Sequence, residues 1–246
     1  MSVNIEKGGL TSFHLKLIAI ITMTIDHVGA GLFPYANMDG VPYLRVIGRL
    51  AFPIFCFLIV EGFFHTRNVK KYMYRLFLFA LLSELPFDLL FNDSGNLFAM
   101  QNVFCTLFIG LVMIYAIDQT YKKWGKDTSN ANIAVVIILF TAGVVASLAK
   151  VDYAELGIAY MAVFYLYRGK NYHIFTILLA LNILFCGINA VQMFSVLAIP
   201  IIACYNGKLG PKVKYLFYVY YPLHIAIILG LYVWIHGHMP TKYFGW

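Results

Sequence analysis

The sequence has very little charge for a chain of its length. Only 12% of its 246 residues are Asp, Glu, Lys or Arg, whereas 61% are hydrophobic. In soluble globular domains about 25% of the residues are charged, because a water-exposed surface has to be covered. The composition therefore excludes an ordinary soluble enzyme and indicates a chain that lies in lipid.

The motifs of several common catalytic sites are also absent. The sequence contains no HExxH, no GxSxG, no P-loop and no CxxC pair. Zinc catalysis, a serine nucleophile and ATP hydrolysis are therefore disfavoured, and we expect no metal. The four cysteines are interpreted as small buried hydrophobic residues in apolar segments: Cys56, Cys105, Cys186 and Cys204.

Long apolar segments are what the sequence has instead. Many of them exceed the 18 or so residues that a helix needs to cross a bilayer. In lipid a helix satisfies its own backbone hydrogen bonds, so we expect an all-α, polytopic membrane helix bundle in a single domain, residues 1–246. About nine transmembrane helices are predicted: 13–33, 44–65, 70–91, 100–118, 131–149, 152–167, 171–188, 190–205 and 213–236. The first is not followed by a small-residue cleavage site, so we interpret it as a membrane helix and not as a signal peptide.

The basic residues gather in alternate loops. They lie between the second and third predicted helices, between the fourth and fifth, after the sixth and after the eighth. Cytoplasmic loops collect Lys and Arg, so the pattern predicts an inside N terminus and an outside C terminus. It also accounts for the net charge of +7 without a nucleic-acid partner. We expect a multi-pass protein of the bacterial inner (plasma) membrane, with the lipid bilayer as its first partner.

Charged and imidazole groups inside predicted spans are costly, and each is therefore a candidate site residue. Asp26 and His27 are adjacent in the first helix, and a rise of 1.5 Å per residue puts His27 in the outer half of the membrane. Similar counting suggests that His27, Arg49 and Glu84 converge at one depth. A structural ion-pair network that locks the first three helices together would give the same pattern.

Two long blocks near the N terminus resemble the TraX family of membrane acetyltransferases: LKLIAIITMTIDHVGAGLFP and LRVIGRLAFPIFCFLIVEGFFHTRNVKKYMYRL. Further similar segments are LPFDLLF, DYAELGIAYMAVFYL and YNGKLGPKVKYLFYVYYPLH. TraX of conjugative plasmids acetylates the N terminus of F-pilin. The resemblance implies transfer of an acetyl group from acetyl-CoA to an amine or hydroxyl outside the cytoplasm. The acceptor, a pilin-like peptide or an envelope glycan, does not follow from it.

The resemblance implies the catalytic role of His27, with Asp26 as its neighbour, and the positions of the other charged groups in the predicted spans suggest roles for them. His27 is the expected general base, with Asp26 beside it, and Arg49 or a helix-end amide would stabilise the oxyanion. We expect the acceptor site to include Glu84, Asp88, Glu155 and His224, the last of which would alternatively orient His27. Phosphates of CoA would bind the basic residues near the inner end of the third helix: Arg67, Lys70, Lys71 and Arg75.

Other functions fit some of the same residues. A proton-coupled small-molecule transporter would also carry intramembrane Asp26, His27, Arg49 and Glu84, although no internal repeat relates two halves of the chain. A structural assembly protein would leave the Asp26–His27 pair unexplained. Within the enzyme hypothesis, direct transfer and an acetyl-histidine intermediate both remain open.

Overall fold

The structure is a computed structural model that describes residues 9–33, 43–91, 99–186, 191–211 and 214–240. These residues form ten α-helices and one 3-10 helix, and no strand is found among them. The helices are α1 (Ser12–Gly31), α2 (Tyr43–Gly48), α3 (Ala51–His65), α4 (Val69–Phe91), α5 (Val103–Trp124), α6 (Ser129–Leu148), α7 (Ala154–Leu166), α8 (Asn171–Cys186), η1 (Val191–Leu197), α9 (Ala198–Ala203) and α10 (Lys214–His236). The prediction of an all-α fold is confirmed for the described residues.

The predicted helix over 44–65 is interrupted. The chain makes a turn at Arg49 and Leu50, between α2 and α3. Pro53 has no N–H to donate to the carbonyl group of Arg49, four residues earlier, so the hydrogen-bond ladder of a continuous helix is broken there. The prediction of one unbroken helix was therefore wrong at this point, and the break lies directly beside the pocket described below.

The predicted helix over 190–205 is also divided. It is a 3-10 helix, η1, followed by the six-residue α9. The side chain of Ser195 in η1 is fully buried and hydrogen-bonds with Tyr160 of α7, so this segment serves polar contacts that an apolar membrane helix would not make. Hydropathy could not reveal that constraint.

Five helical segments are long and apolar enough to cross a membrane, judged by length and composition over the described residues. They are Ser12–Gly31, Tyr43–His65 (α2 and α3 together), Val103–Trp124, Ser129–Leu148 and Tyr215–His236. Shorter apolar helices cover Ala154–Leu166, Asn171–Phe185 and Val191–Ala203. The 23-residue α4 is long enough but contains five charged side chains. The protein is therefore a helical membrane protein.

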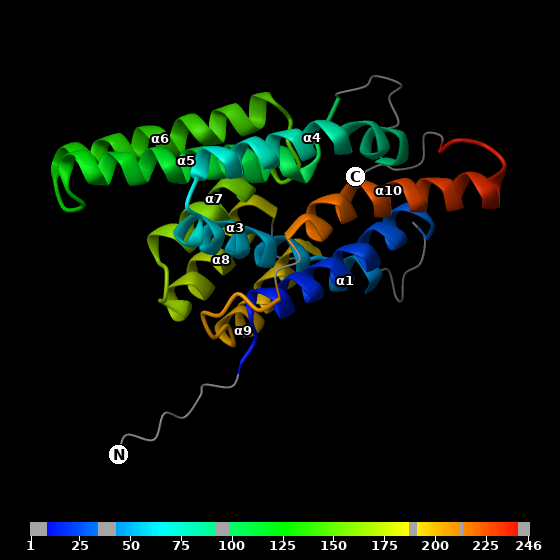
Figure 1. The fold of residues 1–246 in the computed structure, drawn as a ribbon, viewed down its shortest axis with the longest axis horizontal. Coiled ribbons are helices and arrows are strands. Elements are labelled where there is room, and N and C mark those ends of the chain that lie inside the picture. Colours follow the sequence, from blue (N-terminus) through cyan, green and yellow to red (C-terminus); the bar gives the residue numbers. More distant parts are fainter. Residues whose placement is uncertain (1–8, 34–42, 92–98, 187–190, 212–213, 241–246) are drawn as a thin grey trace, which may run out of the picture.

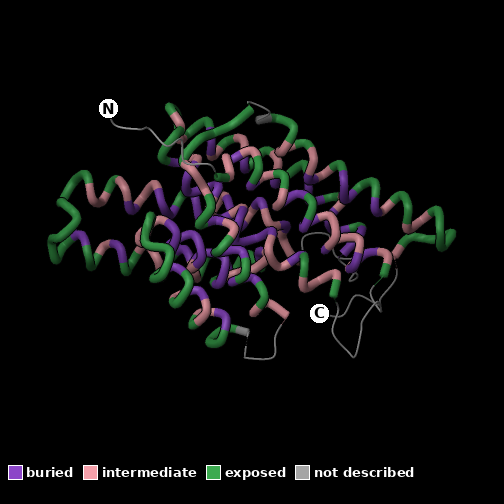
Figure 2. The backbone as a smooth tube through the Cα atoms, turned by 90° about the horizontal axis from the view of Figure 1, so that it is seen from below, coloured by how far each residue is buried: buried purple, intermediate pink, exposed green. Residues whose placement is uncertain are grey.

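The helices lie roughly along one direction, and α5 and α6 form a hairpin that extends beyond the others (Figure 1). The central α3 packs against α1, α5 and α7, while α10 packs against α1 and α4. Buried residues lie in the middle of this arrangement and exposed ones along its outside (Figure 2). The exposed residues of α6 and α10 are largely apolar, as expected of helices that face lipid.

Contacts between distant segments join the ends of the helices. The segment before α1 hydrogen-bonds with the loop before α10, through Leu10 and Asn206. At another place Gln101 pairs with the turn that precedes α7, at Val151. Loops that the charge pattern assigned to the same side of the membrane are thus in contact in both cases.

The expectation that all cysteines are buried is correct only in part. Cys56 is buried, Cys105 is half-buried and Cys204 is exposed. Cys204 is exposed because it follows the last turn of α9, where the chain leaves the bundle. The side chain of Cys186 lies outside the described part of the structure.

Candidate functional site

A pocket opens where α1, α2, α3, α4 and α10 meet the turn before α7. The space between the atoms that line it is about 580 Å³, and this volume includes open solvent at the mouth. Aromatic rings of Phe52, Phe87, Phe91, Tyr153 and Tyr221 form much of its wall. Its charged and imidazole side chains are those of Asp26, His27, Arg45, Arg49 and Asp152. A few polar groups set into an apolar wall are typical of a site for a small molecule or a reacting group.

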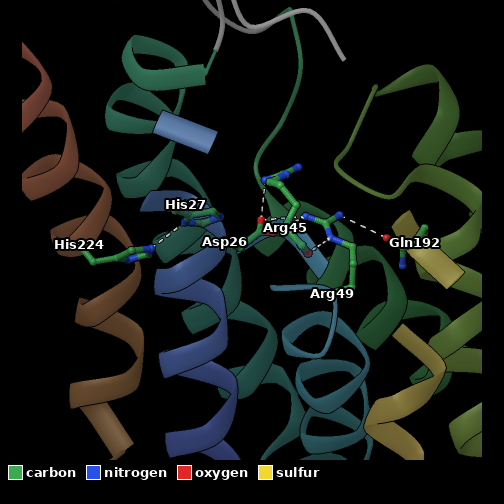
Figure 3. A network of polar contacts seen from close by, with 6 residues as sticks. All are labelled: Asp26, His27, Arg45, Arg49, Gln192 and His224. Atoms are coloured by element: carbon green, nitrogen blue, oxygen red, sulfur yellow. Dashed lines mark hydrogen bonds and ion pairs between the residues drawn. The ribbon is translucent and has the colours of Figure 1, made fainter. Parts of the chain in front are cut away.

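Asp26 is the centre of an ion-pair cluster. Its carboxylate accepts hydrogen bonds from Arg45 Nη1 at 2.7 Å and from Arg49 Nη2 at 2.7 and 2.8 Å (Figure 3). The side chains of these three residues are between 9% and 18% exposed, so removal of one partner would leave a buried charge. Arg49 also donates to Gln192 Oε1 of η1 at 3.2 Å.

Gly48 allows this cluster to form. A Cβ atom at this position would lie 2.1 Å from Asp26 Oδ1, which no real packing tolerates. The glycine therefore brings the backbone of α2 against Asp26 and places Arg45 and Arg49 on either side of the same carboxylate. Its role is one of close approach, and its φ angle is not involved.

His27 pairs with the second intramembrane histidine. Its Nδ1 lies 2.7 Å from His224 Nε2 of α10 (Figure 3). The two ring planes differ by 5° and the ring centroids are 5.0 Å apart. Because the facing nitrogens are much closer than the centroids, the rings meet edge to edge in nearly one plane, the geometry of an N–H···N hydrogen bond. The sequence had suggested Asp26 or Glu84 as the partner of His27 and had left His224 as an alternative, and the structure shows the contact with His224.

The turn before α7 brings Asp152 and Tyr153 to the pocket. Lys150, Tyr153 and Ala154 all have positive φ angles, 51°, 63° and 34°, which are unfavourable for residues other than glycine. Gln101 holds the turn with two backbone hydrogen bonds, and Thr106 donates to the carbonyl of Asp152. The ring of Tyr153 stacks on Phe52 with centroids 3.7 Å apart. Strain of this kind is often found at functional sites.

None of the four predicted acceptor residues lines this pocket, and His224 reaches it only through its contact with His27. Glu84 is buried and accepts hydrogen bonds from the side chain and backbone of Asn102, at the start of α5. Asp88 is buried one turn further along α4. Glu155 is exposed in the first turn of α7. The structure therefore brings His27 and Arg49 together without Glu84, and the role of these three carboxylates in acceptor binding stays a prediction.

The predicted donor residues lie at the other end of α4. Arg67, Lys70 and Lys71 are exposed. Arg75 is half-buried: its guanidinium carbon lies 5.6 Å from the centre of the Tyr72 ring, and the group hydrogen-bonds with the Tyr218 hydroxyl. Its Nε is buried and has no hydrogen-bond partner among the described residues. That orphaned donor fits a site for an anionic group, as the intramembrane position of Arg75 had suggested.

Sequence reasoning assigned no role to several pocket residues. Arg45 and Asp152 carry charge in predicted spans and are candidates by the same rule as Asp26, but nothing in the sequence connected them with the site. Tyr221 and Gln192 gave no signal, because an uncharged residue in an apolar segment is unremarkable by itself. The Tyr221 hydroxyl is buried at the pocket, and its hydrogen has no acceptor among the described residues.

The fold and the pocket define a class: a helical membrane protein with an ion-paired, histidine-containing cavity. Comparison with known proteins adds the family, because the family model described as TraX protein matches residues 12–232. The chain belongs to the TraX family.

Two curated relatives were found. The chain is 32% identical to the "Probable fimbrial assembly protein FimC, serogroup H1" of Dichelobacter nodosus, over 93% of this chain and 97% of the relative. It is 29% identical to an uncharacterized protein of Rickettsia prowazekii (strain Madrid E), over 60% of this chain and 52% of the relative. No solved structure matches the chain significantly.

Proposed function

We propose that this protein is a membrane-embedded acetyltransferase that moves an acetyl group from cytosolic acetyl-CoA to an amine or hydroxyl of an extracytoplasmic acceptor. The observation that carries the proposal is the pocket in which His27 lies beside the cluster of Asp26, Arg45 and Arg49. It combines a group that accepts a proton with groups that stabilise negative charge. Acyl transfer requires both.

In the proposed reaction the acceptor nitrogen or oxygen attacks the carbonyl carbon of the acetyl thioester, while His27 takes the proton from the acceptor. A bond from the acceptor to carbon forms, and the carbon–sulfur bond then breaks. The proton held by His27 passes to the departing thiolate, so His27 returns to its initial state. Arg49 or the Tyr221 hydroxyl, whose hydrogen has no acceptor among the described residues, donates to the oxyanion that develops in between.

The ion pairs also fix the arginine side chains in position. Asp26 fixes the Arg49 guanidinium through two short hydrogen bonds, and Gln192 holds it from the other side. A donor that is already fixed does not have to reorganise when charge develops, and this preorganisation is a large part of enzymatic rate enhancement. Asp26 therefore acts here as an anchor of the arginines and not as the hydrogen-bond partner of His27.

We further propose that nine segments cross the membrane, with the N terminus inside and the C terminus outside. The five long apolar segments would be joined by α4, by α7, by α8, and by η1 with α9. Loops predicted to share a side are in contact, namely Leu10 with Tyr205 and Gln101 with Val151, which supports the alternation. The basic loops decide which side is cytoplasmic. In the basic segment that follows the eighth predicted helix, Lys212 and the side chain of Lys214 lie outside the described part of the structure.

In this orientation the donor enters near Arg75, and Arg67, Lys70 and Lys71 surround the entrance. Arg75 and Phe87, a wall of the pocket, are 12 positions apart in α4, or about 18 Å along its axis. The extended pantetheine arm of CoA, with the long Arg75 side chain at its phosphate end, would carry the thioester along this distance. The relative described as a probable fimbrial assembly protein supports a pilin-like peptide as one acceptor. An envelope glycan is the other, and the location is the bacterial inner membrane.

The proposal is tested with purified protein in liposomes, acetyl-CoA labelled in its acetyl group, and an envelope extract of the source organism as acceptor. We expect label on an extract component and release of one CoA thiol per acetyl group transferred. Arg75→Ala should raise the KM for acetyl-CoA, whereas Lys123→Ala, a change at the far end of α5, should not. Proton-coupled uptake of a solute with no release of CoA thiol would contradict the enzyme and support the transporter.

A further inference from the structure

The hydrogen-bond partners of the His27–His224 pair show which ring nitrogens are protonated, because one of the four nitrogens has a partner that can only accept. His224 Nδ1 lies 2.9 Å from the backbone carbonyl oxygen of Tyr220, one turn earlier in α10. A carbonyl oxygen has no hydrogen to give, so His224 Nδ1 must carry one. In the neutral His224 ring the other nitrogen, Nε2, then has none and can only accept.

The protonation of His224 determines the protonation of His27. His224 Nε2 lies 2.7 Å from His27 Nδ1, so the hydrogen of this short bond belongs to His27 Nδ1. In the neutral His27 ring the remaining nitrogen, Nε2, is left with a lone pair. Figure 3 shows this second nitrogen on the side of Asp26 and Arg45, away from His224. A single backbone carbonyl thus determines which nitrogen of His27 faces the pocket without a proton.

The two rings are held in this register by packing. His27 lies between Phe91 and Tyr221, with ring centroids 5.1 and 6.1 Å away. The helices that carry the two histidines are also linked one turn away, where the hydroxyls of Thr24 and Tyr220 are 2.7 Å apart. His224 itself is 5% exposed, so water does not compete for its nitrogens. The edge-to-edge geometry is therefore a fixed feature of the α1–α10 contact.

We propose that His224 is a positioning residue that holds His27 in the tautomer protonated at Nδ1, with the bare Nε2 facing the pocket. It takes the hydrogen bond from His27 Nδ1 and stabilises the charge when His27 accepts a proton at Nε2. It does not touch the acceptor or the thioester, so of the roles expected from the sequence it has that of orienting His27 and not that of binding the acceptor. The consequence for catalysis rests on the proposed function, whereas the tautomer itself does not.

The tautomer is measured by NMR on protein labelled with ¹⁵N at its histidine rings, with His27 assigned by its loss in His27→Gln. In the wild-type protein we expect the Nε2 resonance of His27 in the range of an unprotonated nitrogen and Nδ1 in that of a protonated one. In His224→Ala the two resonances should move toward each other, because the tautomers then mix. A protonated Nε2 in the neutral wild-type ring, or an unchanged spectrum in His224→Ala, would overturn the proposal.

His236 provides a matched control. It also bonds its Nδ1 to the carbonyl four residues earlier, Tyr232, at 3.0 Å, but it is exposed near the end of α10. His236→Ala should leave the His27 resonances unchanged. If His224→Ala does not fold, the wild-type spectrum decides the question alone.

Transfer kinetics separate this inference from the proposed function. His224→Ala should lower kcat at least about tenfold, as loss of an orienting partner does elsewhere, with an unchanged KM for acetyl-CoA. In His224→Gln the side-chain oxygen can again accept from His27 Nδ1 and should restore part of kcat. Wild-type transfer with no effect of His224→Ala on kcat would overturn the positioning role alone. Absence of transfer in the wild type would overturn the proposed function, and the NMR result would then stand as the test of the tautomer.

Discussion

Two buried polar regions of the molecule differ in charge and in access. The first is the pocket cluster of Asp26, Arg45 and Arg49, which faces a cavity. The second lies between α7, α8 and η1, where Tyr160, Asn182 and Ser195 are fully buried and bond to one another at 2.6 to 3.2 Å. The second region is uncharged and lines no part of the pocket. The comparison teaches that burial and hydrogen bonding alone do not mark a site; charge beside an open cavity does.

The two regions are also connected. Arg49 donates to Gln192, which lies three residues before Ser195 in η1. Asn182 donates to both Tyr160 and Ser195 and also to the carbonyl of Leu178, so it ties η1 to α7 and α8. The uncharged network therefore supports η1, which holds one side of Arg49 through Gln192. We interpret this network as a structural support for the cluster of Asp26, Arg45 and Arg49.

Among substitutions in the two regions, Asp26→Asn is expected to have the largest effect on the unfolding free energy and on acetyl transfer. The substitution leaves two buried guanidinium groups without their shared carboxylate, which costs about 3–5 kcal/mol of unfolding free energy. It also releases Arg49 from its fixed position, so transfer per folded molecule should fall. Unfolding in detergent and label transfer measure the two effects.

A surface ion pair is the control for this substitution. Asp118 pairs with Lys122 at 2.7 Å at the far end of α5, and the lysine side chain is 67% exposed. Asp118→Asn should cost about 0.5 kcal/mol or less, with no change in transfer. An equal loss of stability in the two variants would show that the Asp26 cluster is not a buried network of the kind described.

A smaller effect is expected for Asn182→Leu in the uncharged network. It removes a buried donor, while Tyr160 and Ser195 still bond to each other at 2.6 Å. The unfolding free energy should fall by about 1–3 kcal/mol, measured in the same assay. Transfer per folded molecule should stay near that of the wild type. A loss of transfer larger than that of Asp26→Asn would reverse the assignment of the two regions.

Much of the helical fold could be predicted from the sequence, because hydropathy alone located the apolar helices. What hydropathy could not show was the break at Arg49 and Leu50 or the 3-10 helix around Ser195, since both depend on local hydrogen bonding. The candidate site was predicted in part: intramembrane charge selected Asp26, His27 and Arg49. Their partners depend on how the helices are rotated about their axes, which one sequence does not reveal.

Two residues illustrate that limit. Glu84 has the charge and the expected depth of a pocket residue, but it bonds to Asn102 at the start of α5. His224 is 197 positions from His27, and its pairing with His27 was only one of the roles that the sequence left open. In both cases the residue was correctly selected as unusual in lipid, and only the three-dimensional contact distinguished the two roles.

The central claim is that His27 accepts the proton from the acceptor in the pocket. Its most direct test is the rate of acetyl transfer by His27→Gln, measured per folded molecule beside the wild type and His236→Ala. The account predicts a fall of about 10²–10⁴-fold in His27→Gln, with the same melting temperature within a few degrees and no change in His236→Ala. Transfer by folded His27→Gln at the wild-type rate would contradict it.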